Sequence, residues 1–365
     1  MTAVKAPWTE RYIGIEMRFL LVLVGAALAL GSESWPSVPA APLAGFSFSP
    51  LESTQAGRDP SVDLGRLVEA TQPDLVRLPV YWERVQPTPS DLDFDSVDDL
   101  LQVIQAHNMT SVSQTRVVLV VGARNFLYPE LHQPTWAGDR SQPAIAQQQA
   151  GDAYRAYFDA TITRYRSSPL LYAWQVENEP YDIVTNAGTG EDAISDAQLA
   201  WEMQEVHRLD GRHQAVVTSY DALHPSLDLI QRYAPVLLPL VGGGSGHPNE
   251  ALRLGDAFGL DIYVDGRSVP YRDQTGIALR SEWKAQALVF WADTAHAEGK
   301  QMWLAEMQSE RWNDAGSFSP GDLITQAVDY RQAPLDVVLM WGVDAWLTDP
   351  AWMTAAVQAF SILRS

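Results

Sequence analysis

The chain has 365 residues, of which 46% are hydrophobic, so it is long enough for a large core and for one (β/α)8 barrel. Its 25 basic and 45 acidic residues give a formal net charge of −20, which argues against nucleic acid or an anionic membrane surface as a partner. The chain contains no cysteine, so no disulfide supports the fold.

The N-terminus carries the pattern of a targeting segment. Lys5, Arg11 and Arg18 precede the apolar run 19–30, which reads FLLVLVGAALAL. A transmembrane helix needs about 20 such residues, so this run is short for a membrane span but typical of the apolar region of a signal peptide. We predict that residues 1–31 are a signal peptide or, alternatively, an uncleaved N-terminal anchor. Both alternatives predict an exported protein that is secreted, periplasmic or at the cell surface.

Residues 32–43 are rich in Ser, Pro and Ala and predict a flexible lead-in. No long low-complexity linker follows, so we predict a single domain over residues 44–365. Within it, eight short apolar runs predict strands that begin near Gly45, Asp74, Val117, Leu170, Ala215, Phe258, Met302 and Val337. Between these runs, apolar residues at helical spacing predict helices over 97–107, 146–165, 196–209, 282–298 and 323–330.

This alternation predicts an α/β fold with a parallel sheet and right-handed crossovers. Eight strand–helix units indicate a closed (β/α)8 TIM barrel. The alternative, an open doubly wound sheet that binds a dinucleotide, lacks its usual signal, because no G-x-G-x-x-G follows the first strand.

Two of the predicted strands end in a glutamate. The stretch Leu170–Pro180 reads LLYAWQVENEP, and Pro180 cannot continue a strand, so the strand should stop near Glu179. The stretch Gln301–Met307 reads QMWLAEM and places Glu306 near its end. The carboxyl ends of barrel strands are where catalytic groups lie, and two carboxyls from separate strands are what glycoside hydrolysis requires.

With these two strand ends, the chain from about Gly45 onward resembles the clan A retaining glycoside hydrolases, the barrel enzymes that include the family-five cellulases. The resemblance implies that Glu179, in Asn-Glu-Pro on strand four, is the acid/base and that Glu306, on strand seven, is the nucleophile. It implies a retaining β-glycoside hydrolase that cleaves O-glycosidic bonds of an oligo- or polysaccharide by double displacement. Retaining chemistry predicts carboxyl groups about 5–5.5 Å apart.

The same resemblance implies roles for four further residues. Asn178 would bind the sugar 2-hydroxyl, Arg77 would keep the nucleophile ionised, and Tyr263 would donate a hydrogen bond to it. Trp341 would form an aromatic floor under the sugar. Each has a structural alternative: a turn-capping Asn, an ion-paired Arg, or an aromatic side chain in the core.

Four more residues are weaker candidates for sugar contact. Asp261 stands where family-five members have His, so the hydrogen bonds around the sugar next to the cleaved bond differ from the family pattern. His132 follows the third strand, and Gln308 lies on the strand face of the second glutamate. Asp344 follows the eighth strand. Aromatic residues after strand ends could pave further sugar sites or cover the barrel: Trp82, Tyr128, Trp136, Trp312 and Trp346.

No cofactor or metal is predicted, because the sequence has no His-rich ligand cluster, P-loop or H-E-x-x-H motif. The predicted partner is a carbohydrate substrate. Two alternatives share the barrel: a transglycosidase that uses the same two glutamates, and a carbohydrate-binding barrel without catalytic activity.

Overall fold

The computed structural model describes residues 39–138, 148–181, 194–220, 248–264, 277–311 and 318–365. The predicted signal segment and Trp312 therefore lie outside the described residues. Residues 39–365 form one compact unit. Within the described ranges, no helix combines the length and the hydrophobicity that crossing a membrane requires.

Eight parallel strands close into a barrel in chain order, which confirms the predicted fold class. They are β1 (Leu43–Ser47), β2 (Leu75–Pro79), β3 (Arg116–Val121), β4 (Leu171–Val176), β5 (Gln214–Tyr220), β6 (Ala257–Ile262), β7 (Gln301–Gln308) and β8 (Val337–Trp341). All eight correspond to the predicted apolar runs. The first strand pairs with the last, and Leu43 lies opposite Val337.

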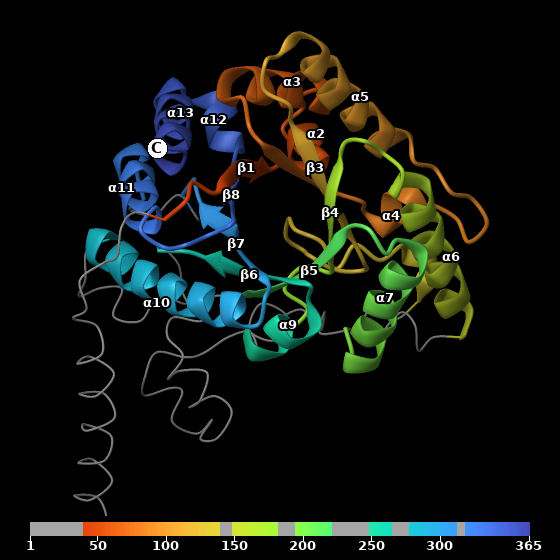
Figure 1. The fold of residues 1–365 in the computed structure, drawn as a ribbon. Coiled ribbons are helices and arrows are strands. Elements are labelled where there is room, and N and C mark those ends of the chain that lie inside the picture. Colours follow the sequence, from red (N-terminus) through yellow and green to blue (C-terminus); the bar gives the residue numbers. More distant parts are fainter. Residues whose placement is uncertain (1–38, 139–147, 182–193, 221–247, 265–276, 312–317) are drawn as a thin grey trace, which may run out of the picture. The chain divides into compact units, whose positions relative to one another are not determined.

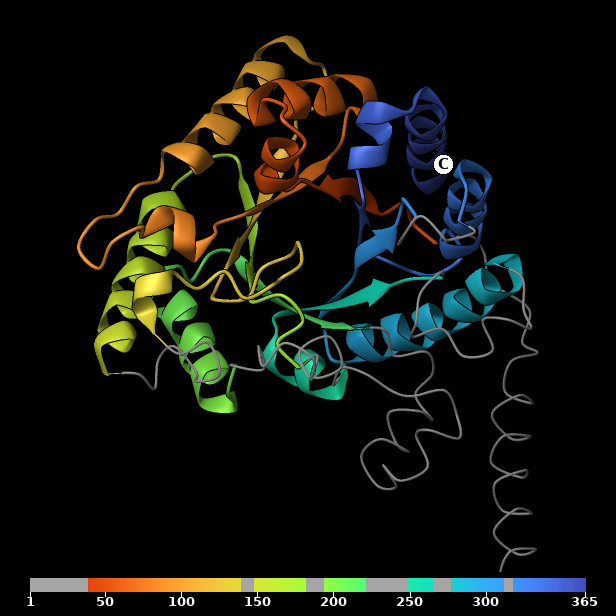
Figure 2. The same cartoon turned by 180° about the vertical axis from the view of Figure 1, so that it is seen from behind.

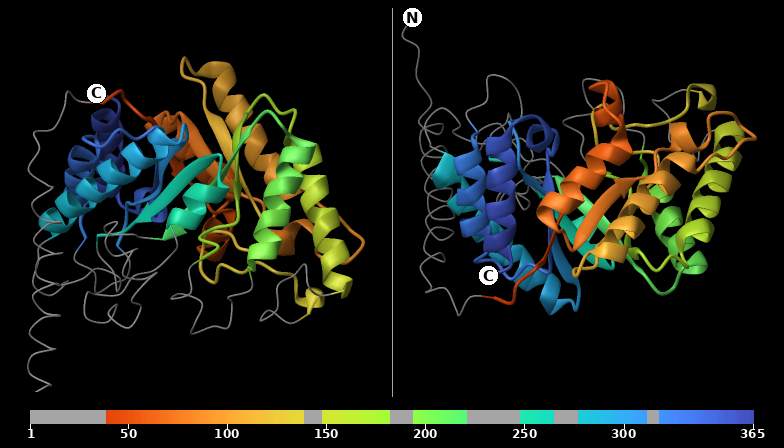
Figure 3. Two further views of the ribbon diagram at one scale, coloured as in Figure 1. Left: turned by 60° about the horizontal axis from the view of Figure 1, so that its bottom comes forward. Right: turned by 90° about the horizontal axis from the view of Figure 1, so that it is seen from above.

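Helices surround the strands, as Figures 1 and 2 show from opposite ends and Figure 3 shows from two further directions. They are α2 (Pro50–Gln55), α3 (Pro60–Thr71), α4 (Trp82–Val85), α5 (Asp95–Thr110), α6 (Gln148–Tyr165), α7 (Asp196–Leu209), α9 (Pro248–Leu254), α10 (Ile277–Ala297), α11 (Pro320–Tyr330), α12 (Asp344–Thr348) and α13 (Pro350–Leu363), with a 3-10 turn at Thr135–Ala137. The five predicted helices correspond to α5, α6, α7, α10 and α11.

The sequence analysis did not predict α3 and α13. Both begin with a strong local signal, an aspartate cap followed by proline at the first helical position. The Asp59 carboxylate accepts from the Ser61 amide at 2.8 Å, and the Asp349 carboxylate accepts from the Ala351 amide at 2.8 Å. The two helices contact each other and complete the ring next to β1.

Side chains on each strand alternate between the helices and the barrel interior. The residues that pack inside the barrel are Leu75, Val118, Ala173, Val216, Ala257, Trp303, Val337 and Leu339. Two or four residues further along the same strands, this interior face carries Arg77, Gln175, Asp261 and Trp341. The interior therefore changes from apolar to polar toward the carboxyl ends of the strands.

A β-bulge in β7 changes this alternation at one functionally important place. Gly259 pairs with Trp303, but Asp261 pairs with Glu306, so β7 contains one more residue than β6 over this stretch. The pairing of β7 with β8 is irregular at the same place. Simple alternation from Trp303 would direct Glu306 toward the helices; the extra residue directs it into the barrel instead.

Candidate active site

A cavity of about 320 Å³ opens at the carboxyl ends of the strands. Its lining residues are Glu52, Phe126, Leu127, Tyr128, Glu130, Glu179, Tyr220, Tyr263, Glu306, Gln308, Glu310, Arg311 and Trp341. Five of these carry a carboxyl group and one carries a guanidinium, so the cavity favours neutral or cationic ligands over anionic ones.

Glu306 is held by two donors. The Arg77 guanidinium donates to one of its carboxylate oxygens and the Tyr263 hydroxyl donates to the other, both over short distances. Arg77 is fully buried and also donates to Gln175 Oε1 at 3.1 Å. Burial, followed by the charges of nearby carboxylates, raises the pKa of Tyr263 well above its usual range, so the phenol keeps its proton and remains a donor. Arg77 supplies the positive charge that compensates an ionised Glu306.

Glu179 lies in a tight turn after β4. The strand ends at Val176, three residues earlier than the sequence suggested, and the backbone then takes left-handed conformations at Glu177 (φ 59°) and Glu179 (φ 45°). The Glu179 amide donates to Thr218 Oγ1 at 3.0 Å. Left-handed backbone at non-glycine residues costs about 1–3 kcal/mol each and is concentrated at functional sites. As a result of this turn, the Glu179 side chain lines the cavity, whereas the Glu177 side chain does not.

The Glu177 side chain points away from the cavity and fastens the loop after β3. Its carboxylate accepts from the Ala123 amide at 2.9 Å and from the Arg124 amide at 2.5 Å. A Cβ at Gly122 (φ +141°) would lie 2.4 Å from the Glu177 carboxyl carbon, so only glycine fits there. On the other side, Tyr154 donates to both Glu177 and Glu202. The sequence analysis missed this buried network.

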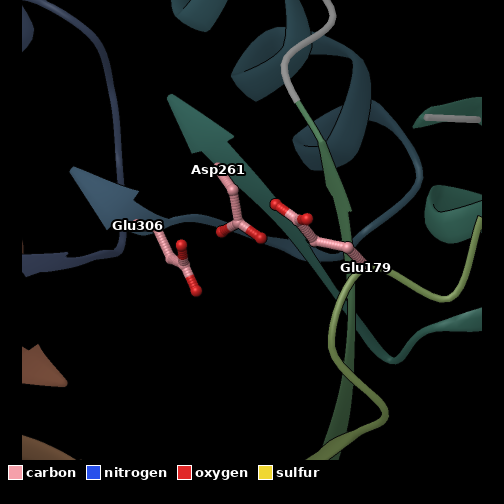
Figure 4. A group of neighbouring side chains, drawn as sticks. All are labelled: Glu179, Asp261 and Glu306. Carbon is pink, nitrogen blue, oxygen red and sulfur yellow. The ribbon is translucent and has the colours of Figure 1, made fainter. Parts of the chain in front are cut away.

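Asp261 completes the site from β6. Figure 4 shows its carboxyl between those of Glu306 and Glu179. One oxygen from each of the three carboxyls lies within 4.8 Å of the others. Both oxygens of Glu306 already accept from Arg77 and Tyr263, so we do not assign the cluster as a metal site. Burial, followed by the charge of Glu306, raises the pKa of Asp261 well above its usual range.

Three other predicted residues lie at or beside this cluster. Trp341 lines the cavity and packs edge-on against Phe126, with ring centroids 5.3 Å apart. Gln308 also lines the cavity, and its Oε1 accepts from the Val264 amide at 2.9 Å. Asn178 is buried behind the cavity lining, where its Oδ1 accepts from Gln175 Nε2 at 3.0 Å.

Two predicted residues have other contacts and are not among the cavity lining. The imidazole of His132 is buried, with Nε2 3.1 Å from the Leu127 carbonyl and Nδ1 3.1 Å from Glu83. Asp344 forms an ion pair with Arg58 at the start of α12. Of the predicted aromatic residues, Tyr128 lines the cavity, whereas Trp82 and Trp346 are buried in the core.

Two further glutamates, Glu52 and Glu310, lie on the cavity wall, and the sequence analysis did not place them in the site. Burial, together with the charges of Glu310 and Asp344, raises the pKa of Glu52 to about 8. Burial also raises the pKa of Glu310 to about 7. Gly342 (φ +98°) leaves the space that Glu310 occupies, since a Cβ there would lie 2.1 Å from Glu310 Cγ. In the sequence, the signal for this close approach is a glycine, Gly342, directly after the predicted β8, because glycine is favoured where φ is positive or where another group comes close to the backbone.

Comparison with solved structures shows which known fold this chain shares. A GH5_18 protein from Streptomyces cattleya, in complex with GlcNAc, is similar with a TM-score of 0.63 and 15% identity over 90% of this chain and 82% of that one. A GH5_18 variant from Bifidobacterium longum, in complex with Manb1-4GlcNAc, has a TM-score of 0.61 and 15% identity over 88% and 78% of the two chains. The chain has a GH5-like (β/α)8 fold.

An exo-beta-1,4-mannosidase from an Opitutaceae bacterium is also similar, with a TM-score of 0.58 and 15% identity over 91% of this chain and 61% of that one. No protein-family model matches the sequence, and no curated protein sequence matches it either. The likeness therefore lies in the fold, as the resemblance noted from the strand ends implied.

Proposed function

We propose that the protein is an exported, retaining β-glycoside hydrolase with Glu306 as nucleophile and Glu179 as acid/base. The observation that carries this proposal is the pair of carboxyls from the ends of β4 and β7, which face one cavity with oxygens within 4.8 Å of each other. Retaining enzymes hold their two carboxyls about 5–5.5 Å apart, whereas inverting enzymes need about 6.5–9.5 Å to admit a water molecule.

The contacts of each glutamate suit its role. Arg77 and Tyr263 hold Glu306 with its negative charge compensated, so that an oxygen can attack the anomeric carbon. Glu179 gives its proton to the leaving oxygen as the glycosidic bond breaks, which leaves a glycosyl ester on Glu306. The Glu179 carboxylate then takes a proton from water, whose oxygen attacks the anomeric carbon and releases the sugar and Glu306.

The cavity favours a small sugar. Its volume of about 320 Å³ is at the lower end of the range for small-molecule sites. Structural neighbours in complex with Manb1-4GlcNAc and an exo-beta-1,4-mannosidase make β-mannosides the first substrates to assay. A screen of aryl β-glycosides of mannose, glucose, galactose and N-acetylglucosamine would test this choice.

The two glutamates are distinguished by their alanine variants. Glu306→Ala removes the attacking group, so turnover of every glycoside should vanish, and added azide should restore it with the α-glycosyl azide as product. Glu179→Ala removes the proton donor, so it should slow substrates with poor leaving groups far more than activated aryl glycosides. With azide this variant should give the β-glycosyl azide. Product anomers by NMR and leaving-group series provide the measurement.

A matched control is Glu69→Ala, which removes an exposed glutamate on α3 and should leave turnover unchanged. Indistinguishable leaving-group dependence in the two active-site variants would refute the assignment of roles, and full activity in both would refute the site. Sugar binding without turnover by the unaltered protein would favour a carbohydrate-binding barrel. Transfer to an added sugar in preference to water would favour a transglycosidase.

A further inference from the structure

Asp261 is a buried acid whose polar neighbour is another carboxyl. Its side chain is fully buried in β6, and among the described residues the one side-chain hydrogen bond that acts on it comes from Glu179. An unpaired charge in such a place is strongly unfavourable, so the group avoids it by keeping a proton. Its nearest acidic neighbours are the two glutamates of the proposed reaction.

The surroundings of Asp261 contain more negative than positive charge. The charged or titratable groups that act on it come from β2, the loop after β3, the turn after β4, the position just after β6, and β7: Arg77, Glu130, Glu179, Tyr263 and Glu306. Arg77 is already engaged by Glu306, and Glu130 is paired with Arg124. Three neighbouring carboxyls, of which a single guanidinium pairs with one, cannot all be ionised in a buried site.

We propose that Asp261 is a positioning residue that is protonated in the resting enzyme and donates that proton in a hydrogen bond to the Glu179 carboxylate that forms during the reaction. This inference rests on the proposed function. Before the reaction, Glu179 and Asp261 carry one proton each. Glu179 passes its proton to the leaving oxygen, and the single proton that remains is shared between the two carboxyls. When Glu179 takes a proton from the attacking water, the starting state returns.

In this proposal, Asp261 stabilises the negative charge that appears on Glu179 during the reaction. Once Glu306 has become an ester, the negative charge resides on Glu179, whereas Arg77 is the ion-pair partner of Glu306. A neutral acid next to Glu179 is then the donor that stabilises this charge. The geometry also gives Glu179 a second source for its own proton at high pH.

The decisive variants are Asp261→Asn and Asp261→Ala. A carboxamide is neutral and can donate to Glu179, so Asp261→Asn should keep kcat within about threefold at acidic pH, whereas Asp261→Ala should lose about tenfold or more. A carboxamide cannot pass a proton on. The alkaline limb of kcat/KM in Asp261→Asn should therefore move down by about one pH unit, with the acidic limb unchanged. Equal losses in the two variants, or an unshifted alkaline limb, would overturn the proposal.

A second measurement does not depend on activity. A buried acid that stays protonated while its unfolded form ionises makes the folded state less stable as pH rises above about 4. Asp261→Asn removes this dependence, so its melting temperature should exceed that of the unaltered protein by an amount that grows between pH 4 and pH 7. If no glycoside is turned over, the proposed function fails and this melting series still decides the protonation of Asp261.

Asp293→Asn is the control. It makes the same chemical change at an exposed position of α10, and it should move neither the alkaline limb nor the melting difference. A melting difference that is flat with pH would overturn the proposal. Stabilisation of the unaltered protein by Ca²⁺ or Mg²⁺ that Asp261→Asn abolishes would also overturn it, because the cluster would then be a cation site.

Discussion

At the scale of single residues, the cavity contains acids that do not behave like surface glutamates. Glu52 and Glu310 line the same cavity as the proposed catalytic pair, with pKa values raised to about 8 and about 7. Both are protonated in the folded state at pH values where the unfolded chain is ionised. Below about pH 4.5 both states are protonated, so these groups cost stability only as pH rises.

Glu310→Gln should therefore raise the melting temperature at pH 8 by about 2 °C or more and leave it unchanged at pH 4.5. Differential scanning calorimetry at the two pH values provides the measurement, and Glu69→Gln, at an exposed position, is the control. A gain of the same size at both pH values would show that the effect comes from packing and not from titration.

Trp341 is the residue for which a binding role and a core role give different results. It is partly exposed to the cavity, whereas Trp346 is 2% exposed and packs edge-on against Phe46 in the core. Trp341→Ala should lower kcat/KM by about tenfold or more with a modest fall in melting temperature. Trp346→Ala should cost about 3–5 kcal/mol of stability. If Trp341→Ala instead unfolds readily and stays fully active when cold, Trp341 belongs to the core.

At the scale of elements, the turn after β4 depends on Glu177. Its carboxylate satisfies the backbone amides of Ala123 and Arg124, and a substitution would leave these buried donors without an acceptor. Glu177→Ala should cost about 2–5 kcal/mol in urea unfolding, because each buried group left unpaired costs about 1–3 kcal/mol. It should also lower kcat on every substrate, since the same turn carries Glu179. A stable variant with normal kcat would show that the turn does not need this anchor.

Hydrophobic patterning was sufficient to predict all eight strands, because buried parallel strands are continuous apolar runs. The sequence was also sufficient to place Glu179 and Glu306 near strand ends. Pro180 cannot continue a strand, and the Asn-Glu-Pro motif is read from three consecutive residues. The bulge that turns Glu306 inward could not be predicted, because it depends on pairing between β6 and β7. The surroundings of Asp261 likewise depend on segments that are distant in the sequence and meet only in space.

At the scale of the whole chain, Pro39–Ser365 contains every strand and helix of the barrel. A protein that begins at Pro39 should therefore fold, and its melting temperature should lie within about 2 °C of that of the full chain. Circular dichroism melts of the two proteins provide the measurement. Loss of folding would show that the residues before Pro39 pack into the domain and are not a dispensable targeting segment.

The closure of β1 onto β8 has a consequence for synthesis. The first strand to leave the ribosome pairs on one side with the last strand to be made, and the final helix, α13, packs against α3. Contacts between the two ends of a chain are slow to form, and until they form the first strand presents an unpaired edge. A nascent chain that lacks β8 is thus an open sheet, and the free edge of β1 stays available for self-association until β8 has been made.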